Sequence, residues 1–329
     1  MGWQTVRRIS QEGVVTVTGK TDAPPPLFLR WLGRTPMARW ESVTFYLMIS
    51  PWVVGFFTFI AYPMVRSFYL AFTRYNLKTP PKWVGLDNFV KMFTNDDLFW
   101  QSFKVTSLYV IGSVPAGTAF ALLVAMILAQ KLRGVNFWRT IYFMPTMVSG
   151  VAVAVMWTYL LNPEFGLVNQ LLDLVGIKGP GWIASTTWAL PSLIMMSWWS
   201  IGGQMVIYLA GLKGIPRELY EAAEIDGAGE WAKFRHVTIP MLSPTIFFNL
   251  VLGLIGAFQV FEGPLVLTEG GPNNATLTYV LNLYNQAFRF INFGYASAMA
   301  WFLFAVIMAM TLLVIRSSAL WVYYEAEAK

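Results

Sequence analysis

Long apolar stretches alternate with short polar segments along most of this chain. An α-helix needs about 20 predominantly apolar residues to cross a bilayer. Six stretches reach that length, and they cover residues 42–65, 105–130, 140–163, 182–212, 241–261 and 293–315. The fourth is expected to begin near Trp188, after an interfacial segment, and Pro115 predicts a kink in the second. The pattern predicts an all-α polytopic membrane protein with six transmembrane helices.

The polar segments divide the chain into parts. We expect residues 1–41 to form a polar tail whose first part is flexible, with Pro24-Pro25-Pro26 favouring an extended conformation. The tail lacks the apolar core of a secretory signal. The other expected parts are the first helix and its external loop (42–104), a core transmembrane domain (105–316) that contains a charged loop (213–240), and a C-terminal tail (317–329).

The distribution of basic residues predicts the orientation. With the N-terminus inside, 15 of the 23 Lys and Arg residues fall in cytoplasmic segments, as the positive-inside rule favours. The first external loop weakens this contrast, because it holds six basic residues against three acidic ones. The tail, the charged loop and the C-terminus are therefore predicted to be cytoplasmic.

Composition supports a membrane protein and excludes several kinds of site. The chain is 56% hydrophobic and 12% charged, with a mean hydropathy of +0.53, whereas soluble domains are about 25% charged. The net charge of +6 follows from basic loops beside the bilayer and does not indicate nucleic-acid binding. The absence of Cys excludes disulfides, thiolate metal sites and a Cys nucleophile, and the single His236 cannot build a His-based metal cluster.

The loop at 213–240 carries the densest charge outside the tail and the first external loop. Pro216 suits the first turn of a helix, and Glu218 and Glu221 would lie near the positive end of its dipole. Gly227 permits a sharp turn, after which 230–236 can form a second short helix. A polar helix–turn–helix at a membrane surface suits docking of a soluble partner. An ordinary amphipathic connector between two spans is the alternative.

Within this loop, Glu221-Ala222-Ala223, Gly227 and Val237-Thr238-Ile239-Pro240 resemble the EAA motif of ABC importer permeases. Asp226-Gly227-Ala228 is similar to the carbohydrate branch of that family, typified by the maltose permease. The usual ending is Ile-x-Leu-Pro, so Val237 and Ile239 are a mild departure. The resemblance implies that the ATPase-coupling residues are Glu221, Ala222, Ala223, Asp226, Gly227, Ala228 and Pro240.

The resemblance extends over residues 40–316. Similar segments lie at 84–89 (VGLDNF), 137–145 (FWRTIYFMP), 162–169 (NPEFGLVN) and 268–272 (TEGGP). It implies a type I importer permease in a bacterial cytoplasmic (inner) membrane. The expected partners are a second, homologous permease subunit that completes a heterodimer, two ATPase subunits, an extracytoplasmic solute-binding protein, a carbohydrate and the lipid bilayer.

The chain has no Gly-x-x-x-x-Gly-Lys-Ser/Thr phosphate loop, so it is not itself the ATPase. We expect a non-catalytic translocation subunit that binds no cofactor or metal, with ATP and Mg held by the partner ATPase subunits. Closure of the ATPase dimer would draw the docked loops together, and rigid spans would carry that motion outward.

Substrate contacts are expected from the fourth and fifth spans, which flank the charged loop. Polar residues within a span usually face the bundle interior or a watery cavity, which favours Gln204, Asn249, Gln259 and Glu262. Trp198 and Trp199 suit stacking on sugar faces or a membrane interface. The resemblance adds the positions that match sugar contacts of the maltose permease, which are Trp199, Ser200, Gly203, Gly253, Gly256, Ala257 and Val260.

Most of these matched positions hold smaller residues than the maltose permease has, which argues against maltose in the same pose. The stripe Gly253, Gly256 and Ala257 on one helix face either lines a wide sugar path or lets another helix pack closely. A third interpretation is that the partner permease makes most contacts. Glu262 fits either a substrate role or a helix-end carboxylate that pairs with a nearby base.

We therefore expect a permease subunit of an ATP-driven importer for a carbohydrate, in particular an oligosaccharide. The basic excess in the first external loop suits either an anionic saccharide or a docking surface for the solute-binding protein. The rival class is an ion-coupled secondary transporter of a small polar solute, which predicts intramembrane carboxylates, and only Glu262 comes near. A membrane-embedded enzyme needs converging acid–base or metal groups within the spans, and the sequence places none there.

Overall fold

The computed structural model describes residues 3–10, 13–20, 36–130 and 133–323. The chain divides into two compact units, Met1–Arg66 and Ser67–Lys329, and each is described by itself.

The first unit contains a β-hairpin that the sequence analysis did not predict. Strands β1 (Trp3–Ser10) and β2 (Gly13–Lys20) pair antiparallel, with Trp3 opposite Lys20 and Ser10 opposite Gly13. The segment Val14-Val15-Thr16-Val17-Thr18 is β-branched throughout, and such residues favour strands. The expected polar tail therefore begins with paired strands, while Pro24-Pro25-Pro26 lies outside the described residues.

A long apolar helix follows. Helix α1 (Pro36–Phe56), the π-helical segment η2 (Phe57–Ala61) and α2 (Tyr62–Ala71) form one continuous candidate span over Trp40–Ala71. None of its most apolar 18-residue window is buried within the chain. Its apolar side chains thus face outward over the whole window, as suits contact with lipid or with another subunit.

The second unit is a helical bundle preceded by a small hairpin. Strands β3 (Thr73–Arg74) and β4 (Lys82–Trp83) pair antiparallel. The first helices are α3 (Asp87–Thr94), α4 (Asp97–Ala129), α5 (Val135–Phe143), α6 (Gly150–Leu160), α7 (Leu167–Leu174), α8 (Ala189–Ser197) and α9 (Gly202–Gly214). The later helices are α10 (Arg217–Ile225), α11 (Glu230–Lys233), α12 (Ile239–Phe258), α13 (Glu262–Leu267), α14 (Tyr279–Tyr284) and α15 (Phe293–Trp321).

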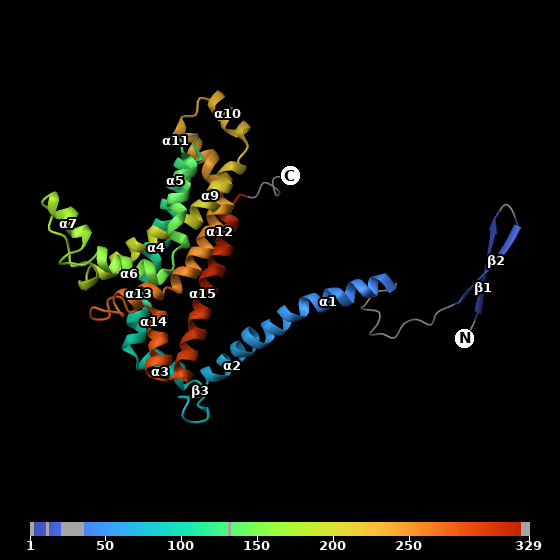
Figure 1. Ribbon diagram of the computed structural model, residues 1–329, viewed down its shortest axis with the longest axis horizontal. Helices are drawn as coiled ribbons and strands as arrows, with labels where there is room; N and C mark the ends of the chain where they lie inside the picture. The colour runs from blue at the N-terminus through green and yellow to red at the C-terminus, as the bar shows by residue number, and fades with distance from the viewer. Residues whose placement is uncertain (1–2, 11–12, 21–35, 131–132, 324–329) are drawn as a thin grey trace. The chain divides into compact units, whose positions relative to one another are not determined.

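Within this unit, α4 is the central helix, and it packs against α8, α9, α12 and α14. Figure 1 shows α4, α9, α12 and α15 running along the bundle, with α10 and α11 at one end and α3 and α14 towards the other. The side chain of Asp96 caps α4 by accepting a hydrogen bond from the backbone N–H of Phe99 at 3.0 Å, so the helix begins eight residues before the predicted span. It continues through Pro115 without interruption.

The described residues contain four helices long and apolar enough to cross a membrane, or up to six if each of two bent pairs is one span. The four are Trp40–Ala71, Asp97–Ala129, Glu230–Leu267 and Phe293–Trp321. The predicted third and fourth spans are the bent pairs, broken by 101° between Met147 and Gly150 and by 47° between Ser200 and Gly202. The apolar run predicted as the third span is broken in the structure, because Val148 is extended just after the 3₁₀ turn η3 (Met144–Met147).

Glycines set how closely the bundle helices approach. A Cβ added at Gly211 on α9 would lie 2.7 Å from Thr245 Oγ1 and 2.8 Å from Leu242 Cδ2 on α12. A Cβ at Gly202 would lie 2.5 Å from the backbone oxygen of Tyr142. Within a bilayer, where burial from water does not drive helices together, such small residues permit the close packing that holds them.

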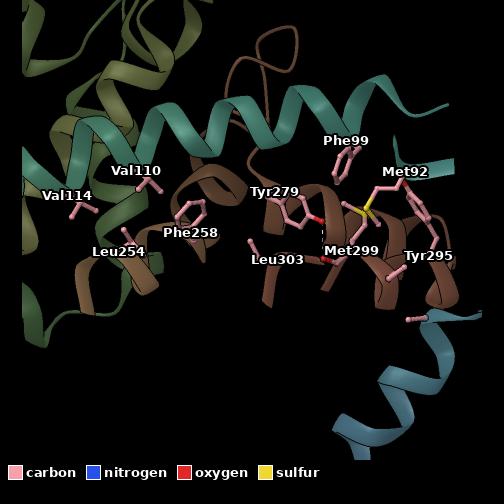
Figure 2. Close-up of a cluster of buried hydrophobic side chains, with 12 residues drawn as sticks. Met92, Phe99, Val110, Val114, Leu254, Phe258, Tyr279, Tyr295, Met299 and Leu303 are labelled. Atoms are coloured by element: carbon pink, nitrogen blue, oxygen red, sulfur yellow. Dashed lines mark hydrogen bonds between the residues drawn. The ribbon is translucent and has the colours of Figure 1, made fainter. Parts of the chain in front are cut away.

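The core near α3 is rich in aromatic side chains. Figure 2 shows Met92, Phe99, Tyr279 and Met299 meeting where α3, α4, α14 and α15 come together. The Tyr279 hydroxyl donates to the Met299 carbonyl at 2.9 Å, and the Tyr279 backbone N–H donates to Thr106 Oγ1 at 2.8 Å. Polar groups in this core are thus paired, as burial requires.

Candidate functional sites: a bundle cavity and a charged loop

Two adjoining cavities lie among α4, α8, α12 and the residues between them. The larger measures about 870 Å³ and the smaller about 230 Å³. Both are lined by Tyr109, Ser197, Ser200 and Val260. We call the two together the bundle cavity. The larger part also reaches Gly150 and Ala154 on α6 and Leu303 and Phe304 on α15. Its size falls within the range of about 300–1,000 Å³ that is usual for small-molecule sites.

Eight of the ten residues predicted for the substrate path line the bundle cavity. These are Ser200, Gln204, Gly253, Gly256, Ala257, Gln259, Val260 and Glu262. Trp199 and Gly203 do not line it. The Trp199 ring is instead 47% exposed and meets Trp157 edge to face at 5.9 Å.

A change of helix type explains why Trp199 departs from the expected position. Residues Trp198–Ser200 form a 3₁₀ turn, η5, directly before the 47° bend into α9. A 3₁₀ helix turns about 120° per residue rather than about 100°, so a position inferred for an α-helix rotates away. Asn249 is also outside the cavity, where it is buried and donates to the Thr245 carbonyl at 3.2 Å.

The small residues of α12 divide between the two roles left open by the sequence. A Cβ added at Gly256 would meet nothing within 4 Å, so this position faces open space. At Gly253 it would lie 3.4 Å from Gln204 Nε2 and 3.5 Å from Val114 Cγ1, which is ordinary contact. Gly256 therefore lies on the cavity face, while Gly253 contributes both to the cavity and to the packing behind it.

The polar side chains of the bundle cavity retain unused hydrogen-bonding capacity. Among the described residues, none hydrogen-bonds to the side chains of Gln204, Gln259 or Glu262. Ser113 Oγ lines the smaller part and is buried without a hydrogen-bond partner. Gln204 is half-buried, and Gln259 and Glu262 are exposed towards the open space of the cavity. Because an unsatisfied buried polar group is costly, Ser113 Oγ in particular suits a space filled by water or by a polar ligand.

Glu262 is the only charged residue that lines the larger part of the cavity among the residues described. It begins α13, and its carboxylate lies against Gly150, where a Cβ would collide with it. No described base pairs with Glu262. Gly150 lies within the apolar run 140–163, so no local pattern marks it, whereas in the structure the chain turns there and α6 begins.

The charged loop at the other end of the bundle has the expected helix and glycine turn. Helix α10 ends in a turn closed by hydrogen bonds from the Ala228 N–H to the Ala223 carbonyl at 2.9 Å and from the Gly227 N–H to the Glu224 carbonyl at 3.0 Å. Gly227 has φ +78°, in the left-handed region that favours glycine. The second helix differs from the expectation, because α11 runs through the π-helical segment η6 (Phe234–Thr238) directly into α12.

Side chains that the sequence analysis did not single out fasten this loop. Lys233 Nζ lies 2.7 Å from Glu224 Oε1 and 2.6 Å from Glu230 Oε1, and its side chain is only 11% exposed. The Tyr220 hydroxyl and Thr238 Oγ1 lie 2.9 Å apart and join α10 to η6. The opposite charges at positions 224, 230 and 233 were the only sign of these ion pairs in the sequence. Residue 224 reaches Lys233 only because the chain turns at Gly227.

The outer face of the loop is apolar as well as charged. Ile225 is 87% exposed and Trp231 is 71% exposed, although both belong to short polar helices. The predicted coupling residues Glu221, Ala222, Asp226 and Gly227 are also exposed, whereas Ala223, Ala228 and Pro240 are half-buried. Exposed large apolar side chains beside charges are typical of a protein-docking surface. The residues described contain no group of His, Cys, Asp and Glu that would hold a metal ion.

Comparison with known proteins gives consistent matches. A family described as "Binding-protein-dependent transport system inner membrane component" matches residues 117–325. The chain is 44% identical to the probable ABC transporter permease protein YesP of Bacillus subtilis (strain 168), over 88% of this chain and 94% of the relative. It is 34% identical to the lactose transport system permease protein LacF of Rhizobium radiobacter, over 85% and 95%.

Among solved structures, the chain is similar to a subunit of a bacterial alginate ABC transporter in complex with an alginate pentasaccharide-bound periplasmic protein. The TM-score is 0.76 at 25% identity, covering 87% of this chain and 97% of that one. A second structure, of a bacterial ABC transporter that imports the acidic polysaccharide alginate, gives a TM-score of 0.75 at 26% identity.

Proposed function

Because the chain belongs to the family of binding-protein-dependent transport system inner membrane components, that is, of ABC importer permeases, we propose that its bundle cavity carries a saccharide across the membrane. The observation that carries the proposal is the cavity itself. It combines apolar walls with the unpaired polar side chains of Gln204, Gln259 and Glu262. Sugar hydroxyls both donate and accept hydrogen bonds, so amides and a carboxylate are suitable partners.

An oligosaccharide is the favoured substrate. The larger part of the cavity, about 870 Å³, is large enough for more than one sugar ring. In the adjoining smaller part, Gly256 and Ala257 are the small residues of α12 that line the space. The relatives transport saccharides by name, including lactose, starch degradation products and arabinooligosaccharides. These names support the class of substrate for this chain.

The charged loop is the proposed site of ATPase coupling. Glu221, Asp226 and the exposed apolar residues Ile225 and Trp231 would meet the ATPase subunit, while Gly227 and Lys233 hold the loop in shape. A stiff loop transmits the closing motion of an ATPase dimer, whereas a soft one absorbs it. The loop continues into α12, so its displacement reaches Gly256 and Gln259 through one helix.

The assembly proposed for this chain has a second permease subunit, two ATPase subunits that bind ATP and Mg, and an extracytoplasmic solute-binding protein. The chain itself supplies no catalysis. Its charged loop and both termini face the cytoplasm of a bacterial cell, because that orientation places most basic residues inside.

Reconstitution tests the proposal. The full complex in proteoliposomes, with ATP inside and the loaded solute-binding protein outside, is expected to accumulate saccharide and to be insensitive to ionophores. A panel of neutral and anionic oligosaccharides then identifies the substrate. Uptake that proceeds without ATP and collapses with the ion gradient would instead establish the rival ion-coupled transporter.

A further inference from the structure

A third hollow, separate from the bundle cavity, lies at the base of the β3–β4 hairpin. It measures about 520 Å³ and is formed by the β3–β4 hairpin, α3 and the start of α15. It shares no lining residue with the bundle cavity. We call it the external pocket. The proposed path does not use it.

Nearly all the lining of the external pocket is polar or aromatic. Four asparagines, two tyrosines and three charged residues form the wall, and these are Asn76, Asn88, Asn95, Asn292, Tyr75, Tyr295, Arg74, Asp87 and Lys91. Planar amides and charged groups offer hydrogen-bond donors and acceptors in fixed directions, and aromatic rings offer an apolar face. A sugar ring presents the matching set, with hydroxyls at its edge and C–H groups on its faces.

The wall is held in place before any ligand arrives. The Asn88 side-chain amide donates to the carbonyls of Ala71 at 2.8 Å and Thr73 at 2.9 Å, so α3 is fixed to the hairpin. Gly294 has no room for a Cβ beside the Thr73 carbonyl, and its N–H donates to the Tyr75 carbonyl at 3.2 Å. Preformed sites of this kind bind with a smaller entropic cost.

Tyr295 links the pocket to the core described above, where Figure 2 shows it beside Met92. Its hydroxyl donates to the Asp96 carboxylate, and Lys91 Nζ lies 4.7 Å from the centre of its ring. Lys91 is exposed to solvent, and the contact with the ring favours a position of its ammonium group beside the pocket. The lysine stays available, because no described carboxylate forms an ion pair with it.

The charges of the pocket favour an anion. Arg74 and Lys91 are cationic, Asp87 is the one carboxylate among the lining residues, and Arg74 makes no ion pair with any described residue. Asp96 is not among the lining residues, and its carboxylate accepts hydrogen bonds from the Tyr295 hydroxyl and the Phe99 backbone N–H. We propose that the external pocket is a subsite for a single sugar unit that carries a carboxylate, such as one uronate unit of an oligosaccharide.

This inference rests on the proposed function, because it assigns an anionic sugar as a ligand of a saccharide importer. The competing occupant is an acidic side chain of the solute-binding protein. A lone carboxylate would need only Arg74 and Lys91. It would leave the Asn95 amide and the Tyr75 hydroxyl, which also line the pocket and have no hydrogen-bond partner among the described residues, without one. The composition of the wall therefore favours a saccharide.

The test uses the assembled complex in lipid nanodiscs without its solute-binding protein. Binding of digalacturonate and of neutral galactobiose is measured by titration calorimetry and saturation-transfer NMR. Wild type is expected to prefer digalacturonate. Arg74→Gln and Lys91→Gln should each weaken digalacturonate binding about tenfold, the usual effect of losing one charge-assisted hydrogen bond, and leave galactobiose unchanged. Lys78→Gln, in the same loop but outside the pocket, is the matched control and should change neither.

Each result has one consequence. Equal digalacturonate binding by wild type, Arg74→Gln and Lys91→Gln would overturn the proposal. So would unchanged sugar binding together with weaker docking of the solute-binding protein, which would assign the pocket to that protein. ATP-driven uptake by the same variants, reconstituted in proteoliposomes with the solute-binding protein, separates failure of the subsite from failure of the proposed function. A complex that imports saccharide but shows no Arg74-dependent binding refutes only the subsite, whereas a complex without uptake refutes the proposed function.

Discussion

The charged loop and the bundle cavity treat their polar groups in opposite ways. In the loop, Lys233 is bound by two carboxylates and the Tyr220 hydroxyl meets Thr238, while large apolar side chains are exposed. In the cavity, Gln259 and Glu262 have no described hydrogen-bond partner, and the apolar side chains form the wall. The polar groups of the loop bind one another and stabilise its conformation. The polar groups of the cavity are left available to a ligand or to water.

This difference agrees with the functions proposed for the two regions. A docking surface gains affinity from exposed apolar side chains held on a stiff frame, which is what Ile225 and Trp231 provide. A translocation path must hold and then release a polar ligand, so unpaired groups in a space of about 870 Å³ suit it. Four substitutions test the comparison, from the largest expected effect to the smallest.

Gly211→Trp should have the largest effect, because it disrupts the packing of α9 against α12, and both the loop and the cavity depend on these helices. A Cβ at Gly211 already lies 2.7 Å from Thr245 Oγ1, so an indole cannot be accommodated between α9 and α12. We expect loss of the assembled complex in gel filtration. Gly214→Trp is the control, because a Cβ there meets nothing within 4 Å. Normal assembly of Gly211→Trp would show that these helices are not packed as described.

Gly227→Val should abolish coupling while the complex still assembles. With φ at +78°, a β-branched residue adds about 1–3 kcal/mol of backbone strain, and relief of that strain would displace α10. Stimulation of ATP hydrolysis by the loaded solute-binding protein should be lost. Gly227→Asn is the control, since Asn tolerates the left-handed region and should retain most of the stimulation. Equal stimulation of ATP hydrolysis in the two variants would show that coupling does not depend on the left-handed backbone conformation at position 227.

Gly256→Trp should narrow the cavity without harming the fold, because Gly256 faces open space. We expect normal yield in gel filtration, with uptake of long saccharides lost before uptake of short ones. A failure to assemble would assign Gly256 to helix packing. Unchanged uptake of both lengths would place the substrate elsewhere.

Lys233→Met should have the smallest effect. It leaves Glu224 and Glu230 without their cation, but both carboxylates are well exposed, so we expect a loss of no more than about 1 kcal/mol in local stability. The loss of local stability would appear as faster amide hydrogen exchange in residues 224–234. It would also weaken retention of the ATPase subunit during purification. Lys213→Met, which has no ion pair among the described residues, serves as the control. Identical exchange in the two variants would contradict a fastening role for Lys233.

The sequence predicted the regular parts of the molecule well. The 29-residue α15 and the long α4 are apolar over a membrane-length window, and nothing in them conflicts with a helix. The turn at Gly227 was predictable because glycine adopts the left-handed conformation more readily than any other residue. Of the ten positions expected on the substrate path, five of the seven from the resemblance and all three chosen for their polarity line the bundle cavity.

What the sequence did not predict depends on contacts between distant segments. The break before Gly150 lies in an apolar run, so no local pattern indicates it. Glycine is required at position 150 because the Glu262 carboxylate occupies the space that a side chain would need. The position of Trp199 was missed because a 3₁₀ turn rotates it away from the cavity. The external pocket joins residues of the hairpin and α3 to Asn292 and Tyr295, about 200 positions later in the chain, and no local pattern signals such a site.

The most direct test of the account is the ratio of saccharide imported to ATP hydrolysed, measured in proteoliposomes for Gly256→Trp beside Gly227→Val. In the proposed mechanism, the bundle cavity carries the sugar and the charged loop couples its transport to ATP hydrolysis. Gly256→Trp should therefore hydrolyse ATP in response to the loaded solute-binding protein yet import little long saccharide, whereas Gly227→Val should lose the response itself. Loss of the response in both variants, or normal import by Gly256→Trp, would contradict the division of roles between the two regions.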